Sequence, residues 1–431
     1  MNSYEEALAW IHSLLKFGIK PGLKRVEWLL KRNGNPEEKI KCIHIAGTNG
    51  KGSTVEYLRS IFNEGGYSVG TFTSPYLITF NERVSINGKP IKNDELLYYA
   101  KMLKPLVDDL SQSELGSPTE FEVITVISLL YFADKKPDLV IYETGLGGLF
   151  DSTNVITPFL SLITNIGYDH MGILGDTLEE IAFQKAGIIK KGIPLISTVE
   201  QQEAIRVIEE RAKAMNSKTY LLGRNFSVQH KESTYSGESF YFKGFNSITV
   251  RAQISMKGQH QIKNAALALA AVDYIRERGL YIIEPEKVRS GLFRAHWAGR
   301  FEKVSSLPDI ILDGAHNLQG VQALKQTIEQ HYRGRRIYLL FAALHDKAYG
   351  NMMKELEPTV DEAYFTSFDF PRAASAEQLL DESPFEKSFS ISPWDKALNE
   401  IKNRLKSDDV LVITGSLYFI SEVRKTFQKS E

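Results

Sequence analysis

Short apolar runs alternate with longer segments of helical periodicity along most of the chain. The apolar runs are rich in Val, Ile and Leu, which is typical of strands in a parallel sheet whose two faces are covered. In the first half of the chain they occupy residues 40–45, 68–72, 139–142, 159–164 and 193–198. Residues 120–133 instead place apolar side chains at helical spacing and predict a helix. This alternation predicts an α/β fold.

The pattern changes near residue 220. Short alternating stretches at 226–229, 239–242 and 247–254 predict a small antiparallel sheet, and an alanine-rich helix is expected at 261–278. After a predicted linker at 295–300, strands are expected at 310–312, 337–341, 362–366 and 410–413. A chain of 431 residues exceeds the usual size of a single core. We therefore predict two domains, residues 1–297 and residues 298–431.

Composition narrows the class of protein. A net charge of −1 argues against a broad nucleic-acid surface, and 43% hydrophobic residues are ordinary for a soluble globular protein. The one cysteine, Cys42, lies in a predicted strand, which fits a reducing compartment. The first 20 residues lack the basic start and apolar block of a secretion signal, and no apolar run of about 18 residues occurs. We expect a cytoplasmic protein that binds neither nucleic acid nor membranes.

A glycine-rich turn between the first predicted strand and a helix that ends near Glu64 is the clearest chemical signal. It reads AGTNGKGST over residues 46–54. Glycines let backbone N–H groups approach phosphate oxygens, and the helix N-terminus favours anions. Lys51 would reach the β- and γ-phosphates, and Ser53 or Thr54 would bind Mg²⁺. The strict phosphate-loop pattern is not met, because Ile45 and Gly52 stand where it has a glycine and a hydroxyl. A plain turn is the alternative interpretation.

Polar residues also follow other predicted strands, where open parallel sheets bind their ligands. Glu143 is a natural partner for Mg²⁺, although it would equally cap a glycine turn. His170 follows Asp169, but Mg²⁺ prefers oxygen ligands and a lone histidine is usually structural. Lys185 lies among apolar residues, where partial burial would lower its pKa and free the amine. On chemistry alone, a surface lysine whose stem covers apolar area is the favoured interpretation.

Further candidates follow in the second half of the chain. Asn264 would hydrogen-bond a purine edge or cap a helix, and the cap is favoured from the sequence alone. Arg300 lies in the predicted linker, and Asp313, His316 and Ser416 follow predicted strands. These groups predict a second binding surface that faces the first domain.

The motifs, taken in their order, resemble the folylpolyglutamate synthase family of the Mur ligase superfamily. The resemblance runs from Ala46 to Tyr418 and rests on AGTNGKGST, TSPY at 73–76, NERVSING at 81–88, ETGLGG, DSTN at 151–154, YDHMGILG, QKAGIIK, HQIKNA, GR and LDGAHN. It implies a phosphate-loop NTPase-like ATP-binding domain with a mostly parallel sheet, followed by a smaller Rossmann-like glutamate-ligase domain. It also implies ATP, two Mg²⁺ ions and a monovalent cation such as K⁺.

The resemblance assigns roles to residues that the chemistry alone left open. Lys185 matches a lysine that becomes carbamylated and bridges to a second Mg²⁺. The nucleotide is implied to contact Thr48, Asn49, Gly50, Lys51, Gly52, Ser53, Thr54, Asn264, Arg300 and Asp313. The implied metal ligands are Ser53, Glu143, His170 and Lys185. The implied catalytic set is Lys51, Lys185 and His316, and the implied substrate contacts are Ser74, Pro75, Tyr76 and Phe121 for the pterin and His316 and Ser416 for glutamate.

The reaction implied is ATP-dependent ligation of L-glutamate to the γ-carboxylate of a reduced folate by a monomeric enzyme. Leu149, Gln184 and Tyr76 depart from the family pattern, which puts the pterin preference in doubt. The nearest rival is dihydrofolate synthase, alone or as a second activity. A cell-wall Mur ligase is disfavoured by the GKGS spelling and by the absence of a further N-terminal domain. A nucleotide-dependent switch protein is disfavoured by the polar strand ends of a whole second domain.

Overall fold

The computed structural model describes residues 1–428, which pack as two compact units. The first unit comprises Met1–Gln229, Phe242–Val250 and Lys263–Ala295, and the second comprises His230–Tyr241, Arg251–Ile262 and the chain from His296 onwards. The division into residues 1–297 and 298–431 stays a prediction beside this packing. Within the described residues, no helix combines the length and the apolar character that crossing a membrane would require.

The first unit is built on an eight-stranded sheet in the order β4-β3-β2-β5-β1-β6-β7-β8. The pairs from β2 through β8 are parallel, whereas β3 and β4 form an antiparallel edge. The strands are β1 (Cys42–Ala46), β2 (Val69–Phe72), β3 (Val84–Ile86), β4 (Lys89–Pro90), β5 (Leu139–Glu143), β6 (Leu160–Ile163), β7 (Leu195–Ser197) and β8 (Thr219–Leu221). The apolar runs predicted as buried strands are confirmed, since β1, β2, β5, β6 and β7 are buried at every residue.

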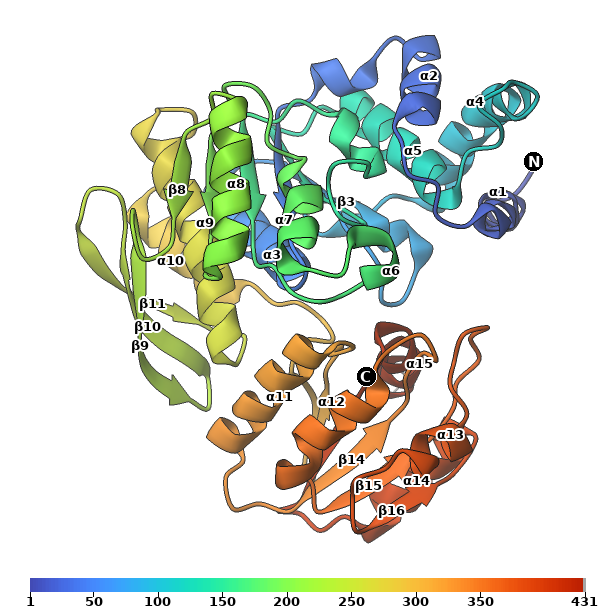
Figure 1. The fold of residues 1–431 in the computed structure, drawn as a ribbon, viewed down its shortest axis with the longest axis vertical. Helices are drawn as coiled ribbons and strands as arrows, with labels where there is room; N and C mark the ends of the chain where they lie inside the picture. The colour runs from blue at the N-terminus through green and yellow to red at the C-terminus, as the bar shows by residue number, and fades with distance from the viewer. Residues whose placement is uncertain (429–431) are drawn as a thin grey trace. The chain divides into compact units, whose positions relative to one another are not determined.

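Helices cover this sheet (Figure 1). They are α1 (Tyr4–Ser13), α2 (Lys24–Arg32), α3 (Lys51–Glu64), α4 (Asn93–Ser111), α5 (Glu120–Lys135), α6 (Met171–Leu174), α7 (Leu178–Ala186), α8 (Gln202–Ala214), α9 (Gln259–Glu277) and α10 (Pro285–Arg294). Helix α5 is buried nearly all round, in keeping with its apolar composition, and Thr119 and Glu122 form a capping box at its start. The predicted helix at 120–133 is thereby confirmed.

The second unit contains a six-stranded sheet in the order β12-β13-β17-β14-β15-β16. Its strands are β12 (Glu302–Ser306), β13 (Asp309–Leu312), β14 (Ile337–Phe341), β15 (Glu362–Phe365), β16 (Ser388–Ser390) and β17 (Val410–Thr414). Its helices are α11 (Leu318–His331), α12 (Tyr349–Leu356), α13 (Ala376–Asp381), α14 (Trp394–Arg404) and α15 (Leu417–Gln428). All pairs are parallel except β12 with β13. The predicted α/β class, with a large and a smaller sheet, is confirmed.

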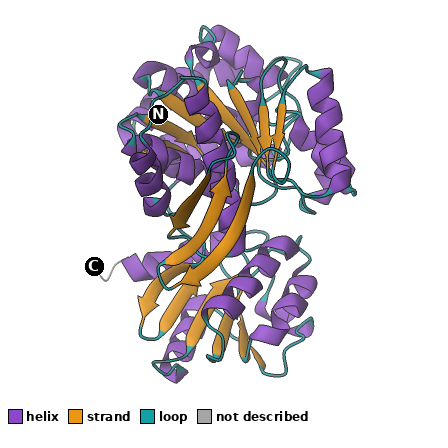
Figure 2. Ribbon diagram, turned by 90° about the vertical axis from the view of Figure 1, so that its left-hand side faces the viewer, coloured by secondary structure: helices purple, strands orange, loops and turns teal. Residues whose placement is uncertain are grey.

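A three-stranded sheet in the order β11-β10-β9 accounts for the change of pattern near residue 220. Its strands are β9 (Ser227–Thr234), β10 (Gly237–Lys243) and β11 (Thr249–Ile254), drawn in orange with the other strands in Figure 2. The first two are longer than the predicted stretches at 226–229 and 239–242. The residues that β9 adds, 230–234, are polar and at least partly exposed, and β10 adds the buried Gly237 and Glu238 and the exposed Lys243, so an apolar pattern did not mark them.

A buried carboxylate ties β10 to α11 within the second unit. Glu238 is fully buried and accepts hydrogen bonds from the His331 ring at 2.9 Å, from the backbone N–H of Gly258 at 2.8 Å and from the Ser233 hydroxyl. The ring of His230 lies 3.3 Å from the same carboxylate. Burial raises the pKa of Glu238, but the bonds from His331, Ser233 and Gly258 outweigh it and hold the pKa at about 2.

We expect this carboxylate to make unfolding depend on pH. Its pKa is lowered by folding, so its stabilisation is complete above about pH 4.5, the ordinary glutamate range, and is lost as the pH falls towards 2. Glu238→Gln should lower the free energy of unfolding at pH 7 by roughly 2–3 kcal/mol, because charge-assisted bonds are lost. Urea unfolding at pH 7 and pH 3 measures both effects.

The matched control is Glu232→Gln, since Glu232 is a half-exposed glutamate on β9 that pairs with Arg251. It should change the free energy of unfolding by less than about 1 kcal/mol. Equal effects of the two substitutions, or an unchanged acid dependence in Glu238→Gln, would contradict the role given to Glu238.

Candidate functional site

The loop between β1 and α3 has the geometry of a phosphate cradle. Gly50, the N-cap residue directly before α3, lies in the left-handed region with φ 83°, and Gly52 lies in the first turn of the helix. At Gly47, with φ 155°, a Cβ atom would lie 1.8 Å from the Thr164 hydroxyl oxygen. Both positions therefore require glycine, and the helix directs its unpaired N–H groups towards the loop.

Residues after β6 hold this loop in place. The Asn165 backbone oxygen accepts from the Thr48 N–H at 3.0 Å, and its side-chain oxygen accepts from the Asn49 N–H at 2.8 Å. The Thr164 hydroxyl donates to the Asn49 carbonyl oxygen at 2.6 Å, and Thr48 exchanges hydrogen bonds with Gly167. Asn165 was not among the predicted site residues. The sequence feature that could have indicated Asn165 is its position directly after a predicted strand, where the other candidates also lie.

Lys51 reaches back over the loop from the first turn of α3. Its Nζ donates to the carbonyl oxygens of Gly47 at 3.1 Å and Thr48 at 3.3 Å, and it lies 3.9 Å from a Glu143 carboxylate oxygen. An ammonium group above the mouth of the loop is where a β- or γ-phosphate needs a counter-charge. Of the two hydroxyls proposed for Mg²⁺, Thr54 donates to the Gly50 carbonyl oxygen at 2.9 Å, which favours Ser53.

The acidic side of the site fits a hard cation. Glu143 ends β5, and its second oxygen accepts from the Ser74 N–H at 3.3 Å. Carboxylate and hydroxyl oxygens are the donors that Mg²⁺ prefers. His170 directly precedes the short helix α6, with φ 51°, and its side chain is partly exposed. Among residues 1–428, no group of three or more His, Cys, Asp or Glu side chains is placed to hold a metal ion. Of the implied metal ligands, only Glu143 and His170 are residues of these four types.

Lys185 corrects the interpretation favoured by chemistry alone. It is buried, with only 4% of its surface exposed, and its Nζ donates to the Gly47 carbonyl oxygen at 3.0 Å. Burial and the nearby Lys51 ammonium lower its pKa to about 7, against the opposing effect of Asp169 and Asp151. The prediction of a surface lysine is wrong, because α7 packs this position against the phosphate loop.

Asn264 also differs from the favoured interpretation. It lies inside α9, which begins at Gln259, so it does not cap that helix. Its side chain approaches the phosphate loop, because a Cβ atom on Gly50 would lie 2.2 Å from Asn264 Oδ1. The amide of Asn264 therefore lies beside the loop, and this position is compatible with the alternative interpretation, a hydrogen bond to the nucleotide.

We expect Gly50→Ala to weaken ATP binding at least tenfold, since the added methyl group would displace Asn264 and strain the loop. Gly66→Ala is the matched control, because Gly66 has a similar φ of 87° but nothing within 4 Å of its Cβ position. Each substitution should cost about 1 kcal/mol of stability through the backbone. Calorimetric titration with ATP separates them, and equal ATP affinities would contradict the packing argument.

The predicted pterin contacts lie near the ends of β2 and β5. Phe121 packs on Phe72 at 5.8 Å between ring centroids, and its ring would be 2.5 Å from a Cβ atom on Gly145. Pro75 and Tyr76 follow Ser74 in the loop after β2, and the Tyr76 ring packs against Phe80. Tyr76 and Phe121 contact the same hydrophobic core.

Asp151 organises the loop after β5. Its two carboxylate oxygens accept from the Leu146 N–H at 2.8 Å and from the Thr153 N–H at 3.0 Å. Burial raises its pKa, although these bonds favour the charged form. The sequence placed Asp151 in the DSTN motif without assigning it a role. Its hydrogen bond from the Leu146 N–H, five residues earlier in the chain, explains why a carboxylate is needed at this position.

The remaining candidates belong to the second unit. Asp313 follows β13 and accepts hydrogen bonds from the N–H groups of Phe301 at 2.8 Å and Ala315 at 2.9 Å. Burial raises the pKa of this carboxyl group, and the opposing effect of the Arg300 charge is smaller. The His316 ring bonds the Gly314 carbonyl oxygen at 2.8 Å. Ser416 is buried after β17, which pairs with β13. The paired strand ends thus bring these candidates to one edge of the sheet.

Comparison with known proteins agrees with this geometry. A family model described as Mur ligase middle domain matches residues 45–272, and one described as Mur ligase, glutamate ligase domain matches residues 299–417. The chain is 48% identical over 425 residues to a dihydrofolate synthase/folylpolyglutamate synthase of Bacillus subtilis, covering 98% of this chain and 99% of that protein.

Two solved structures share the fold over almost the whole chain. A folylpolyglutamate synthase of Mycobacterium tuberculosis complexed with ADP has a TM-score of 0.91 and 28% identity, covering 98% of this chain and 99% of that one. FolC of Escherichia coli in complex with DHPP and ADP has a TM-score of 0.89 and 28% identity, covering 100% of this chain and 98% of that one.

Proposed function

Since the chain belongs to the folylpolyglutamate and dihydrofolate synthase family of Mur ligases, we propose that it joins L-glutamate to the γ-carboxylate of a reduced folate, using ATP. The observation that carries the proposal is the phosphate cradle at residues 47–53 with Lys51 and Glu143 at its mouth. A similar protein is known in complex with ADP, which supports ATP as the nucleotide.

The proposed reaction has two steps. A γ-carboxylate oxygen of the folate attacks the γ-phosphorus of ATP, so that an acyl phosphate forms and ADP leaves. The α-amine of glutamate then attacks the acyl carbon, loses a proton and expels phosphate through a tetrahedral intermediate. Lys51 and the N–H groups of the loop offset the negative charge that develops on the phosphates. The protein's main contribution is to hold the reacting groups in line and to exclude water.

We propose that Ser53, Glu143 and His170 hold one Mg²⁺, which when bound supplies positive charge to the phosphates. The oxygen donors of Ser53 and Glu143 fit such an ion, and the Glu143 carboxylate already lies beside Lys51. A second Mg²⁺ would be held at carbamylated Lys185, and a monovalent cation such as K⁺ belongs to the same proposal.

Carbamylation of Lys185 is a chemically balanced step in this setting. The neutral amine attacks the carbon of CO₂ and loses a proton, which converts a cation into a carboxylate-like anion. A pKa of about 7 makes the neutral amine available near neutral pH. Lys185 is thus proposed as a positioning residue that holds the second ion.

Substrate contacts are proposed on both units. Asn264, Arg300 and Asp313 would hold the nucleotide, and His316 and Ser416 would hold the incoming glutamate. Ser74, Pro75, Tyr76 and Phe121 would contact the pterin. The packing of Phe121 beside Gly145, close after Glu143, supports the last assignment. We also propose that the enzyme is a cytoplasmic monomer.

A second candidate is dihydrofolate synthase activity, in which glutamate is joined to dihydropteroate by the same chemistry. The relative that is 48% identical carries both names, which favours two activities on one chain. Of the three departures from the family pattern, Tyr76 is itself a proposed pterin contact, and the Leu149 N–H donates to the Gln184 carbonyl oxygen at 2.7 Å, so the acceptor is left to be measured.

The test is ADP release from ATP with Mg²⁺ and L-glutamate, run separately with tetrahydrofolate and with dihydropteroate. We expect glutamate-dependent turnover with tetrahydrofolate. Turnover with both acceptors would add the second activity, and turnover with dihydropteroate alone would replace the first. Glutamate-independent ATP hydrolysis with neither acceptor would reject ligation and favour a nucleotide-dependent switch.

A further inference from the structure

The proposed reaction assigns no role to the segment NERVSING at residues 81–88. This segment contains Glu82, the third residue of the short 3₁₀ helix η3 (Phe80–Arg83). The residues that precede the helix, 73–79, include three of the proposed pterin contacts, and we call them the acceptor loop. Glu82 is thus a carboxylate placed directly beside a loop that the reaction needs.

The Glu82 carboxylate binds the end of the acceptor loop through both of its oxygens. One oxygen accepts hydrogen bonds from the N–H groups of Leu77 at 2.9 Å and Ile78 at 3.1 Å. The other accepts from the N–H groups of Thr79 at 2.9 Å and Ile78 at 3.2 Å. An ionised carboxylate has acceptor sites for all four contacts and forms stronger hydrogen bonds than a neutral oxygen. Three consecutive backbone donors therefore converge on one side chain, which fixes the path of the loop.

A second carboxylate holds the start of the acceptor loop. The Ser74 N–H donates to a Glu143 carboxylate oxygen at 3.3 Å, and the Thr73 N–H donates to the Arg83 carbonyl oxygen at 3.0 Å. Glu143 itself lies 3.9 Å from Lys51 Nζ at the mouth of the phosphate cradle. The loop is therefore tied at its start to the phosphate cradle and at its end to Glu82.

Helix η3 also supports the aromatic ring of the loop. The Arg83 guanidinium carbon lies 5.2 Å from the centroid of the Tyr76 ring and 5.5 Å from that of the Phe80 ring. The two rings pack at 5.8 Å between centroids. Contacts between a cation and a ring within about 6 Å are attractive. Because Glu82 ties the helix to the loop, it keeps these groups together.

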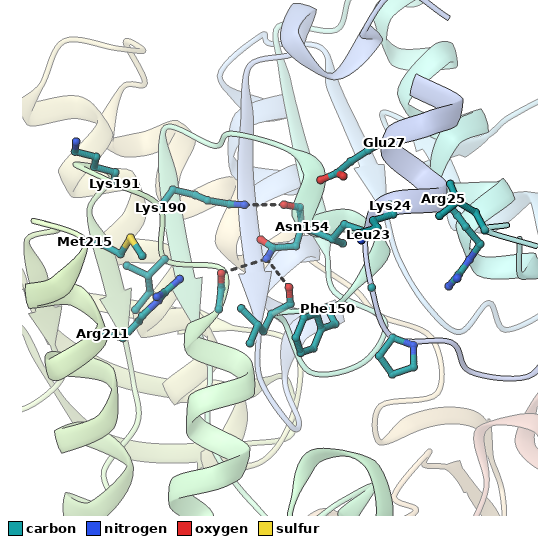
Figure 3. Close-up of a pocket in the computed structure, with 16 residues that line it drawn as sticks. Leu23, Lys24, Arg25, Glu27, Phe150, Asn154, Lys190, Lys191, Arg211 and Met215 are labelled. Atoms are coloured by element: carbon teal, nitrogen blue, oxygen red, sulfur yellow. Dashed lines mark hydrogen bonds between the residues drawn. The ribbon is translucent and has the colours of Figure 1, made fainter. Parts of the chain in front are cut away.

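These contacts lie outside the cavity of about 620 Å³ in the first unit, which Figure 3 shows with Phe150 and Arg211 in its lining. Among the described residues that line it, there is neither Glu82 nor any member of the acceptor loop. A substitution of Glu82 should therefore act through the acceptor loop and leave the lining of this cavity unchanged.

We propose that Glu82 is a positioning residue for the ligation: its carboxylate fixes the acceptor loop relative to Glu143, so that the acceptor is held in line with the phosphate cradle. The inference rests on the proposed function, because it takes Ser74 and its two neighbours as pterin contacts. Glu82 acts through the loop and touches no reacting atom. A displacement of about 1 Å at such a loop is enough to slow a reaction about 100-fold.

The test compares Glu82→Gln with wild type in the full chain. Glutamine has the same length but replaces one acceptor oxygen by an NH₂ donor, which opposes one of the backbone N–H groups. With the acceptor that wild type uses, tetrahydrofolate or dihydropteroate, we expect kcat/KM for that acceptor to fall about 100-fold while Kd for ATP stays within about threefold. Amide hydrogen exchange without substrates should become faster at residues 77–79 and stay unchanged at residues 47–53. Circular dichroism reports folding, and Glu82→Ala stands in if Glu82→Gln is not folded.

The matched control is Glu95→Gln, because Glu95 accepts a hydrogen bond from the Lys92 N–H at 3.1 Å at the start of α4 and pairs with Lys135 at 2.6 Å. Both variants should lower Tm, but Glu95→Gln should leave kcat/KM for the acceptor unchanged. Unchanged kcat/KM or unchanged exchange in folded Glu82→Gln, or equal losses of kcat/KM in the two variants, would overturn the proposal. If wild type turned over neither acceptor, the proposed function would fail and the role of Glu82 in ligation with it, whereas the exchange rates would still show whether Glu82 holds the loop.

Discussion

Lys51→Ala is expected to lower kcat for ATP-dependent ligation by about 1000-fold, the loss found when a main electrostatic contact to a transition state is removed. The ammonium group of Lys51 lies over the phosphate loop, 3.9 Å from Glu143, and no backbone group can take over its charge. ADP release under saturating substrates measures the effect.

The fold should survive this substitution. Lys51 donates hydrogen bonds to two carbonyl oxygens of its own loop, those of Gly47 and Thr48, so its removal should leave Tm within about 3 °C. Lys41→Ala is the matched control, because Lys41 is an exposed lysine directly before β1. Wild-type turnover in a folded Lys51→Ala variant would contradict the assignment of residues 47–53 as a phosphate cradle.

Lys185→Ala is the second large effect. We expect turnover to fall by about 1000-fold and to recover in part when acetate or formate is added, because a small carboxylate would occupy the place of the carbamate. Lys191→Ala, at an exposed lysine six residues along the chain, should keep full activity. Full activity of Lys185→Ala without any added carboxylate would reject the carbamate.

The same lysine sets an expected dependence on pH and CO₂. With a pKa of about 7, the Lys185 amine is mostly protonated below pH 7, and only its small neutral fraction can react with CO₂ there. Enzyme freed of CO₂ should therefore regain activity on addition of bicarbonate quickly at pH 8 and slowly at pH 6. A ¹³C resonance from labelled bicarbonate that is absent in Lys185→Ala would identify the modified residue.

Local pattern sufficed for much of the fold and for one half of the site. The run before the glycine-rich turn is buried at every residue of β1, and the polar residues after it are set by the strand–loop–helix geometry. Glu143 could be placed because strand ends in a parallel sheet share one edge. These inferences need only near neighbours in the chain.

Long-range packing decided what local pattern did not. Lys185 contacts a carbonyl 138 residues away, and only that contact shows that it is buried. Asn264 meets Gly50 although more than two hundred residues separate them. Glu238 finds His331 across 93 residues, and nothing in either stretch marks the pair. Apolar periodicity also missed β12, whose residues are half-exposed at the sheet edge.

The central claim is that ATP activates the folate carboxylate as an acyl phosphate before glutamate is added. The direct measurement uses tetrahydrofolate labelled with ¹⁸O at both oxygens of its γ-carboxylate, with ATP, Mg²⁺ and L-glutamate, followed by mass spectrometry of the folate product and of the phosphate. The account predicts a folate heavier by one glutamyl residue and one ¹⁸O atom in each phosphate released. Phosphate without ¹⁸O, formed alongside an unchanged folate, would contradict it.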